Sequence, residues 1–391
     1  MSRPRVLVVV GTRPEVIKLA PVIQRLRATG VLDVQVCATG QHRELLDQAL
    51  AHFDLSPDHD LALMTRDQSL AELTARALVA LDELLARVAP ALTFVQGDTS
   101  TAFAAALASY YRRVPVAHVE AGLRTGNKHS PYPEEINRRF IAPVADLHFA
   151  PTESARSNLL SESIPEHSVR VTGNTAIDAL FYTLQRERGR PLAFRTLDGH
   201  TVDDAALAGN RLLLVTAHRR ENHERGLANI CAALAQIAER HADVRIVFSL
   251  HFNPNVRRAV LPLLSARPNV HLVDPLNYQT FCRLMERAYL ILTDSGGIQE
   301  EAPSLGKPVL VLRDTTERPE GIAAGNARLL GTATETVVAH VDELWTDRAA
   351  YARMAEARNP YGDGRAAERI EAITHEFLGI PASATVAGGE T

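Results

Sequence analysis

The stretch that decides the fold is Val6-Leu7-Val8-Val9-Val10 followed by Gly11-Thr12-Arg13-Pro14-Glu15. An apolar, β-branched run ends there in a short polar cluster, and four later stretches share this design. They are Leu92–Val95 before Gln96-Gly97-Asp98-Thr99, Val116–Val119 before Glu120-Ala121-Gly122, Leu212–Ala217 before His218-Arg219-Arg220-Glu221-Asn222, and Leu290–Thr293 before Asp294-Ser295-Gly296-Gly297. In open parallel sheets, ligands bind beyond the carboxyl ends of the strands. Since the clusters occur in both halves of the chain, we predict one site built jointly by two α/β domains.

Helix-like segments alternate with strand-like runs along the chain. Helical spacing of apolar residues predicts helices near 15–28, 70–88, 227–238, 278–287, 298–305, 337–345 and 366–377. Further strand-like runs lie at 34–38, 147–150, 169–171, 244–249, 270–273 and 308–312. Such alternation is typical of βαβ units and parallel sheets. The fold class predicted is therefore α/β, with two Rossmann-like, doubly wound domains.

Composition shifts suggest where the domains end. We place an N-terminal domain at 1–185 and a C-terminal domain at 205–360, and interpret the polar, turn-rich residues 185–210 as a linker. Residues 381–391 are small and polar, which predicts a flexible tail.

The overall composition narrows the function classes. The net charge of the 391 residues is −4, which gives no electrostatic case for a nucleic-acid or membrane-surface partner. No apolar stretch approaches the ~20 residues of a membrane helix. The three cysteines, Cys37, Cys231 and Cys282, lack the spacing of a disulfide framework or zinc site, so we expect a cytoplasmic protein without a metal.

Two of the polar clusters suit an anionic ligand. With Pro14 as the first helical residue, Arg13 occupies the cap, where arginine is unfavourable, so Arg13 and the nearby Lys18 are candidates for an anion site at the helix start. The alternative is an ordinary βα turn. Gly296 and Gly297 are unfavourable at a helix start, and close approach of phosphate oxygens is one compensation; the alternative is a flexible turn.

Three further residues of the polar clusters are candidate contacts to phosphate or ribose. Ser295 is a good N-cap that also suits a phosphate, and Glu301 suits ribose hydroxyls. His218, beside two arginines, suits a phosphate better than a metal, because His223 is poorly spaced for a metal pair.

Three carboxylates in the first half suit acid/base chemistry. Asp98 and Glu120 follow predicted strands, and Glu134 lies in a proline-rich loop that enters a helix. Any one of these carboxylates alone would be interpreted as a helix cap or a surface charge. Because all three are expected at the same edge of the sheet, we predict that they form a catalytic set.

Together these motifs resemble the non-hydrolysing UDP-N-acetylglucosamine 2-epimerases. The resemblance runs from Gly11 to about Phe377. Besides the clusters above, it includes Val119-Glu120-Ala121-Gly122-Leu123-Arg124-Thr125, Pro133-Glu134-Glu135-Ile136-Asn137-Arg138, Gly173-Asn174-Thr175 and Glu317-Arg318-Pro319-Glu320.

The resemblance implies a GT-B-like fold in which two domains face a central cleft and a C-terminal helix, within 361–380, packs back on the first domain. It implies reversible C2 epimerisation of UDP-N-acetylglucosamine to UDP-N-acetylmannosamine, by anti elimination of UDP to 2-acetamidoglucal and re-addition. Neither a cofactor nor a metal is implied.

Residue by residue, the resemblance makes Asp98, Glu120 and Glu134 the acid/base carboxylates and His218 a diphosphate contact that stabilises the leaving group. It places Arg13 and Lys18 near the diphosphate, Ser295 and Gly296 on phosphate, Glu301 on the ribose, Phe281 in the uracil pocket and Arg318 in the cleft. Gln41 and His42 resemble part of a regulatory site found in some members. Glu44 and Asp67 stand where glutamine and arginine are expected there, and a carboxylate would repel a second diphosphate.

Several other functions fit the same fold. They are a GT-B glycosyltransferase, a hydrolysing epimerase, an epimerase of a 2,3-diacetamido or uronic-acid UDP-sugar, and a catalytically silent UDP-sugar-binding regulator. The intact Asp98, Glu120, Glu134 and His218 argue against the last. A homodimer is expected, as the commonest state of soluble oligomers.

Overall fold

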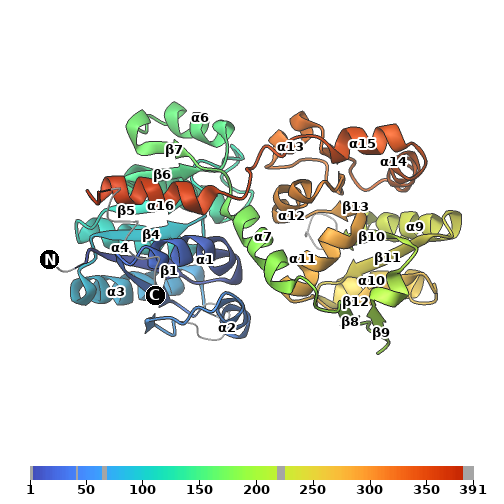
Figure 1. Cartoon of the computed structure of the whole chain (residues 1–391), viewed down its shortest axis with the longest axis horizontal. Helices are drawn as coiled ribbons and strands as arrows, with labels where there is room; N and C mark the ends of the chain where they lie inside the picture. The colour runs from blue at the N-terminus through green and yellow to red at the C-terminus, as the bar shows by residue number, and fades with distance from the viewer. Residues whose placement is uncertain (1–2, 41–42, 64–67, 218–224, 382–391) are drawn as a thin grey trace. The chain divides into compact units, whose positions relative to one another are not determined.

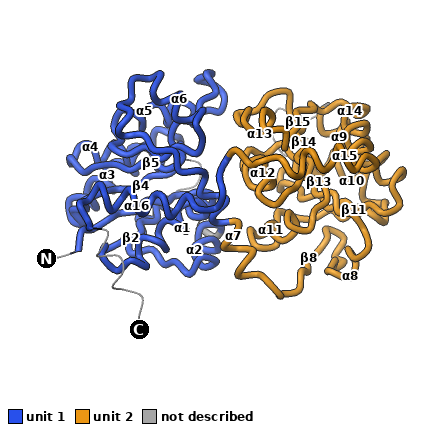
Figure 2. Tube along the Cα trace, turned by 45° about the horizontal axis from the view of Figure 1, so that its top comes forward, with its two compact units in different colours: residues 1–179, 361–391 blue, residues 180–360 orange. Residues whose placement is uncertain are grey.

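The computed structural model describes residues 3–40, 43–63, 68–217 and 225–381. The chain forms two compact units: residues 1–179 with 361–391 make unit 1, and residues 180–360 make unit 2 (Figure 2). The first boundary falls within helix α7 (Thr175–Glu187), so one helix begins in unit 1 and ends in unit 2.

Unit 1 is built on a seven-stranded parallel sheet with the strand order β3-β2-β1-β4-β5-β6-β7. Figure 1 labels five of these strands, β1, β4, β5, β6 and β7. The strands are β1 (Arg5–Val10), β2 (Asp33–Ala38), β3 (His59–Asp60), β4 (Leu92–Gln96), β5 (Val116–Val119), β6 (Leu147–Ala150) and β7 (Val169–Val171). The helices are α1 (Arg13–Ala28), α2 (Arg43–His52), α3 (Leu70–Val88), α4 (Ser100–Tyr111), α5 (Glu134–Ile141), α6 (Glu153–Ser161), the start of α7, and α16 (Ala366–Phe377).

Burial on both faces explains why the strands of unit 1 are continuous apolar runs. Every residue of β4, β5 and β6 is buried, as expected where helices cover both sides of a parallel sheet. On one side, Leu81 and Leu84 of α3 pack in one core cluster with Ala102 and Ala106 of α4. The predicted α/β alternation is confirmed.

Unit 2 repeats the architecture with six parallel strands in the order β12-β11-β10-β13-β14-β15. They are β10 (Arg211–Thr216), β11 (Val244–Ser249), β12 (Val270–Val273), β13 (Ala288–Thr293), β14 (Val309–Val311) and β15 (Ala327–Leu329). The helices are α8 (Asp204–Leu207), α9 (Arg225–Arg240), α10 (Pro254–Leu264), α11 (Tyr278–Arg287), α12 (Gly296–Glu301), α13 (Pro319–Ala324), α14 (Thr334–Thr346) and α15 (Arg348–Ala355).

Residues 185–210, which the sequence suggests as a linker, carry regular structure that belongs to unit 2. An antiparallel hairpin joins β8 (Ala193–Arg195) to β9 (Thr201–Asp203). Its turn residue Leu197 donates its backbone N–H to the Leu272 carbonyl at 2.8 Å, which fastens the hairpin to edge strand β12. The turn signal in the sequence is real, but it marks a hairpin rather than a connection between domains.

Helix α16 comes from the far end of the chain and packs on unit 1 (Figure 1). Arg25 of α1 pairs with Glu371 of α16 at 3.1 Å. The Asp178 carboxylate accepts the backbone N–H groups of Ala366 and Ala367 at 3.2 and 2.9 Å, so a distant side chain caps the helix.

Three further observations concern the class of protein. Within the part of the chain that the structure describes, no helix is long and apolar enough to cross a membrane. Likewise, no group of three or more histidine, cysteine or acidic residues in those ranges is arranged to hold a metal ion. The three cysteines are free and buried.

Candidate active site

The Gly11–Glu15 turn differs from its prediction at the helix cap. Thr12, not Arg13, is the N-cap of α1, and Pro14 follows Arg13 inside the first turn. The Glu15 carboxylate reaches back to accept the backbone N–H groups of Gly11 and Thr12 at 3.0 and 2.6 Å. It also accepts the Thr99 hydroxyl at 2.7 Å. The predicted cap is one residue too late, because Thr12 and Glu15 form a capping box that sets the helix start at Thr12.

Glu15 itself is a structural residue at the sheet edge. It is 1% exposed, and burial raises its pKa although its hydrogen bonds act in the opposite direction. Its contacts tie the turn after β1 to the turn after β4, which brings the Arg13 and Asp98 segments close together.

Lys18 and Glu120, which the sequence assigns to separate roles, form an ion pair with each other. The Lys18 ammonium, one turn into α1, pairs with the carboxylate of Glu120 just after β5. Their side chains are only 13% and 9% exposed. Glu120 has a backbone φ of 66°, an uncommon conformation for a residue with a side chain and one that is frequent at functional sites.

Asp98 lies in the turn after β4 and is held by α5. The Arg138 guanidinium pairs with its carboxylate. Asn137 donates its side-chain N–H to the Asp98 carbonyl at 2.9 Å. Glu134, the third predicted carboxylate, is the first residue of the same helix and is partly exposed. The three carboxylate segments are thus connected within unit 1.

Glu135 is a residue of this network that sequence reasoning missed. It is fully buried and pairs with Arg138 at 3.5 Å and with Arg139 at 3.2 Å. It also accepts the backbone N–H groups of Thr125 and Gly126 at 3.0 and 3.2 Å. The signal was available, since Glu135, Arg138 and Arg139 lie at helical spacing on a short helix.

In unit 2, the Ser295–Gly297 segment starts helix α12. Ser295 is its N-cap, as predicted, but its side chain makes no capping hydrogen bond within the described residues. The Ser295 N–H donates to the Thr293 hydroxyl at 3.0 Å, and that hydroxyl lies 2.7 Å from the Thr216 hydroxyl. These contacts bring the ends of β10 and β13 together at the start of α12.

The two glycines of this turn have different surroundings. A Cβ atom on Gly296 would lie 2.8 Å from Cζ of Arg318, whereas a Cβ on Gly297 would meet nothing nearer than the Glu301 carboxylate at 4.0 Å. Close packing against Arg318, a residue of the same unit, therefore leaves no room for a side chain at Gly296. Arg318 Nε donates to the Glu300 carboxylate at 2.9 Å, so this guanidinium is fixed beside the turn.

A second pair of charges supports Arg318. Arg313 donates to the Glu317 carboxylate at 2.7 Å, and Arg318 lies 3.7 Å from the same carboxylate. Burial raises the pKa of Glu317, but the two arginines outweigh burial and lower it to about 2. Glu317 therefore stays ionised and anchors both arginines.

The remaining predicted contacts of unit 2 lie on α11 and α12. Glu301 is 9% exposed. Its charge acts on the buried Cys282, whose pKa is raised chiefly by burial and further by Glu301. Phe281 is partly buried and packs against the apolar core of the unit. His218, Gln41 and His42 lie outside the described residues, as does Asp67.

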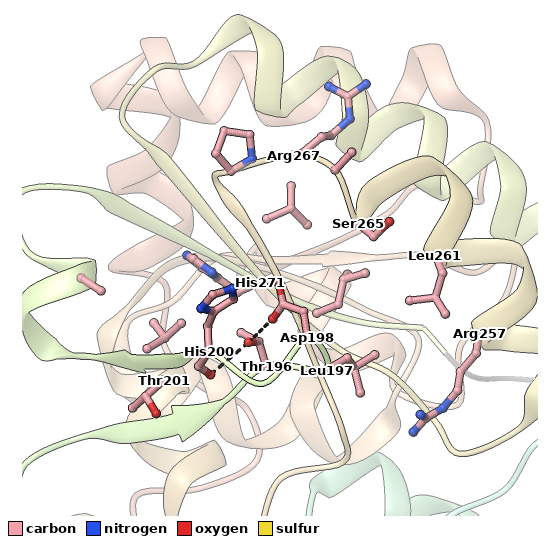
Figure 3. Close-up of a pocket in the computed structure, with 16 residues that line it drawn as sticks. Thr196, Leu197, Asp198, His200, Thr201, Arg257, Leu261, Ser265, Arg267 and His271 are labelled. Carbon is pink, nitrogen blue, oxygen red and sulfur yellow. Dashed lines mark hydrogen bonds and ion pairs between the residues drawn. The ribbon is translucent and has the colours of Figure 1, made fainter.

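A separate pocket of about 680 Å³ lies in unit 2, beside strand β12 (Figure 3). Its walls are the β8–β9 hairpin, residues 257–268 and β12, and none of the described site residues predicted above lines it. Its arginines are already paired, Arg257 with Asp274 and Arg267 with Glu239. None of the carboxylates predicted for acid/base chemistry lies on its walls, so the pocket is not where that chemistry is expected.

Comparisons with known proteins identify the family. Residues 24–375 match the family described as UDP-N-acetylglucosamine 2-epimerase. The UDP-N-acetylglucosamine 2-epimerase of Yersinia pestis is 50% identical over 367 residues, which cover 94% of this chain and 97% of that protein. The crystal structure of the Neisseria meningitidis UDP-GlcNAc 2-epimerase bound to UDP-GlcNAc matches with a TM-score of 0.86 and 46% identity, covering 95% of this chain and 100% of that chain.

A more distant match concerns the fold alone. The structure of a glycosyltransferase from Rickettsia africae matches with a TM-score of 0.62 at 12% identity, and covers 97% of this chain and 99% of that one. The epimerase matches are far closer in sequence and extend over nearly the whole chain. The chain belongs to the UDP-N-acetylglucosamine 2-epimerase family.

Proposed function

We propose that the protein catalyses reversible inversion at C2 of UDP-N-acetylglucosamine, which gives UDP-N-acetylmannosamine. The observation that carries the proposal is the placement of three carboxylates in unit 1: Asp98 is held by α5, the helix that Glu134 begins, and Glu120 pairs with Lys18 of α1. Family membership supports the reaction, and the UDP-GlcNAc named in the Neisseria meningitidis structure supports the substrate.

The proposed chemistry is an anti elimination followed by re-addition. A base removes the C2 proton, the C–H electron pair forms the C1=C2 double bond, and the C1–O bond breaks as UDP departs with its electron pair. The intermediate is 2-acetamidoglucal. UDP then bonds to C1 again while an acid gives a proton to C2 on the opposite face. The protons taken and given balance, so the net change is the configuration at C2.

Unit 1 suits this chemistry because its carboxylates come from different elements. Asp98 follows β4, Glu120 follows β5 and Glu134 begins α5, so they are not confined to one face of one helix. Inversion requires a base on one face of the sugar and an acid on the other. The ion pairs with Arg138 and Lys18 orient two of these carboxylates before the substrate binds.

Unit 2 supplies the groups that we assign to UDP. Ser295, Gly296 and Gly297 would contact phosphate beside the fixed guanidinium of Arg318. Glu301 would contact the ribose, and Phe281 the uracil. Arg13 and Lys18 of unit 1 remain candidates for the diphosphate, as does His218. Donors fixed at the departing diphosphate stabilise the charge that develops as C1–O breaks.

Proton NMR of the purified protein with UDP-N-acetylglucosamine in D₂O tests the proposal. Growth of UDP-N-acetylmannosamine with deuterium at C2 is expected. Free N-acetylmannosamine with UDP would instead show a hydrolysing enzyme. An unchanged substrate in the presence of UDP binding would overturn the proposal and direct the search to a modified UDP-sugar or to transfer onto an acceptor.

The homodimer stays a prediction. Light scattering during size-exclusion chromatography of the full chain would give twice the 42.7 kDa chain mass if it is correct.

A further inference from the structure

His118 lies in β5, two residues before Glu120, and faces the turn that carries Asp98. Its side chain is 1% exposed, and its Nε2 lies 2.7 Å from the carbonyl oxygen of Gly97. A carbonyl oxygen only accepts hydrogen bonds, so Nε2 carries the proton and donates it. The acceptor belongs to the residue immediately before Asp98.

Hydrogen bonds hold the backbone of the turn at Gly97 on both sides of the residue. Gly97 has a φ of 68°, and a Cβ atom there would meet nothing within 4 Å. Its N–H donates to the Val119 carbonyl at 3.0 Å, while Asn137 holds the next carbonyl, that of Asp98. His118 holds the carbonyl between these two contacts. Removing its donor would leave a buried acceptor unsatisfied at the base of the Asp98 side chain.

The ring of His118 is suited to a fixed donor role. Burial lowers its pKa to about 3; the bond to Gly97 opposes this shift, and His148, Arg124 and Arg138 add to it. The ring is therefore neutral at physiological pH. Its Nδ1 is buried and has no hydrogen-bond partner among the described residues. The single ring proton is thus committed to Nε2.

We propose that His118 is a positioning residue for Asp98, and that its Nε2–H bond to the Gly97 carbonyl fixes the turn on which the carboxylate stands. The inference rests on the proposed function, because it takes Asp98 as an acid/base group. Since β5, the strand that contains His118, ends directly before Glu120, the bond also ties the Asp98 turn to the segment that carries Glu120. The residue need not touch the substrate.

His148 provides a matched control. It lies on the neighbouring strand β6, directly opposite His118 in the register, and is also 1% exposed. Burial lowers its pKa to about 4, and its ring is hydrogen-bonded to the backbone of Ala145 instead of the Asp98 turn. Replacing either histidine by phenylalanine removes one buried imidazole of this sheet. Only His118→Phe also removes a hydrogen bond to the turn that carries Asp98.

The test compares steady-state epimerisation by His118→Phe, His118→Gln and His148→Phe. A misplaced catalytic group can cost about 100-fold in rate, so we expect His118→Phe to lower kcat by about 100-fold while KM changes by less than about threefold. Glutamine restores an N–H donor, so the kcat of His118→Gln should be at least about tenfold higher than that of His118→Phe. The kcat of His148→Phe should stay within about threefold of the wild-type value. A kcat for His118→Phe equal to that of His148→Phe would overturn the proposal.

Two further measurements separate positioning from general destabilisation. In an Asp98→Asn background, adding His118→Phe should lower kcat by less than about threefold, because residues that act through one another are not additive. A second, full loss there would overturn the role. Long-range ¹H–¹⁵N spectra of the wild type should show a neutral ring protonated on Nε2 at pH 7, in signals absent from His118→Gln.

The spectra do not depend on activity, because the ring is observed in the wild type and the His118→Gln variant serves only to assign its signals. A proton on Nδ1, or a charged ring at pH 7, would overturn the proposal. Wild-type protein that leaves UDP-N-acetylglucosamine unchanged would overturn the proposed function, whereas an active wild type with an equally active His118→Phe variant would remove the positioning role alone.

Discussion

The adjacent glycines of α12 allow a sharp comparison, because the same substitution should have opposite effects at the two positions. Neither Gly296 nor Gly297 has a positive φ, so alanine fits the backbone at both. Alanine in place of glycine in a helix stabilises by roughly 0.5–1 kcal/mol. Since Gly297 has room for a Cβ atom, Gly297→Ala should raise the free energy of unfolding by about that amount.

Gly296→Ala should lower the free energy of unfolding instead. Its Cβ would stand 2.8 Å from Cζ of Arg318, and ordinary contact begins near 3.4 Å, so the guanidinium must move by about 0.6 Å. That movement disrupts the 2.9 Å bond from Arg318 to Glu300, whose side chain is 1% exposed. A hydrogen bond between charged groups contributes about 1.5–3 kcal/mol. When the stabilisation of the helix by alanine is subtracted, the free energy of unfolding should fall by about 1–2 kcal/mol.

Urea unfolding and thermal melts of the ligand-free variants measure this difference. We expect the two variants to differ by about 2 kcal/mol, or by roughly 4–8 °C in Tm. Titration calorimetry should also show UDP binding about tenfold weaker in Gly296→Ala, since Arg318 is one of its proposed contacts. If Gly296→Ala is as stable as Gly297→Ala, Arg318 is not fixed by Glu300 and the reasoning is refuted.

Three other variants test separate parts of the molecule. Asp98→Asn should keep its fold and its affinity for UDP while kcat falls by about 100-fold or more; full activity would remove Asp98 from the mechanism. The pKa of Glu317 is about 2 in the folded chain and 4.5 ordinarily, so its stabilisation is present above pH 4.5 and is lost as the pH falls toward 2. Glu317→Gln should lack that part of the pH dependence in urea titrations, and an unchanged slope would contradict the ion pairs with Arg313 and Arg318. Asp178→Ala should lower the free energy of unfolding by about 1–2 kcal/mol and speed hydrogen exchange in residues 366–377, because α16 loses its cap; unchanged exchange there would argue against that role.

The strands could be predicted from the sequence because a strand buried on both faces of its sheet consists almost entirely of apolar residues. β1 and β10 are apolar nearly throughout, since both faces of each sheet are covered. Helix α3 was equally clear, because its apolar residues recur at helical spacing over nearly its whole length. Helix α4 was not predicted. It is rich in alanine and buried over much of its circumference, so it lacks the one-sided pattern that indicates a surface helix.

The candidate site was predictable only as a set of residue types. Strand ends identified Asp98 and Glu120, but their partners could not be found from spacing. Lys18 is 102 residues from Glu120, and Arg138 is 40 residues from Asp98. These pairs depend on which strands are neighbours and on which helix covers the sheet edge. Only the three-dimensional arrangement shows that the cations near the carboxylates belong to α1 and α5.

The return of α16 to unit 1 sets an order of events during synthesis. Unit 2 is continuous from residue 180 to residue 360, whereas unit 1 lacks α16 until the chain beyond 360 has been made. At roughly 5–20 residues per second, about 10–40 seconds pass between the last residue of the first segment and the arrival of the second. During that interval, Asp178 has no helix to cap and Arg25 has no Glu371 to pair with. On the ribosome, the unit encoded second is therefore the first to have all of its parts.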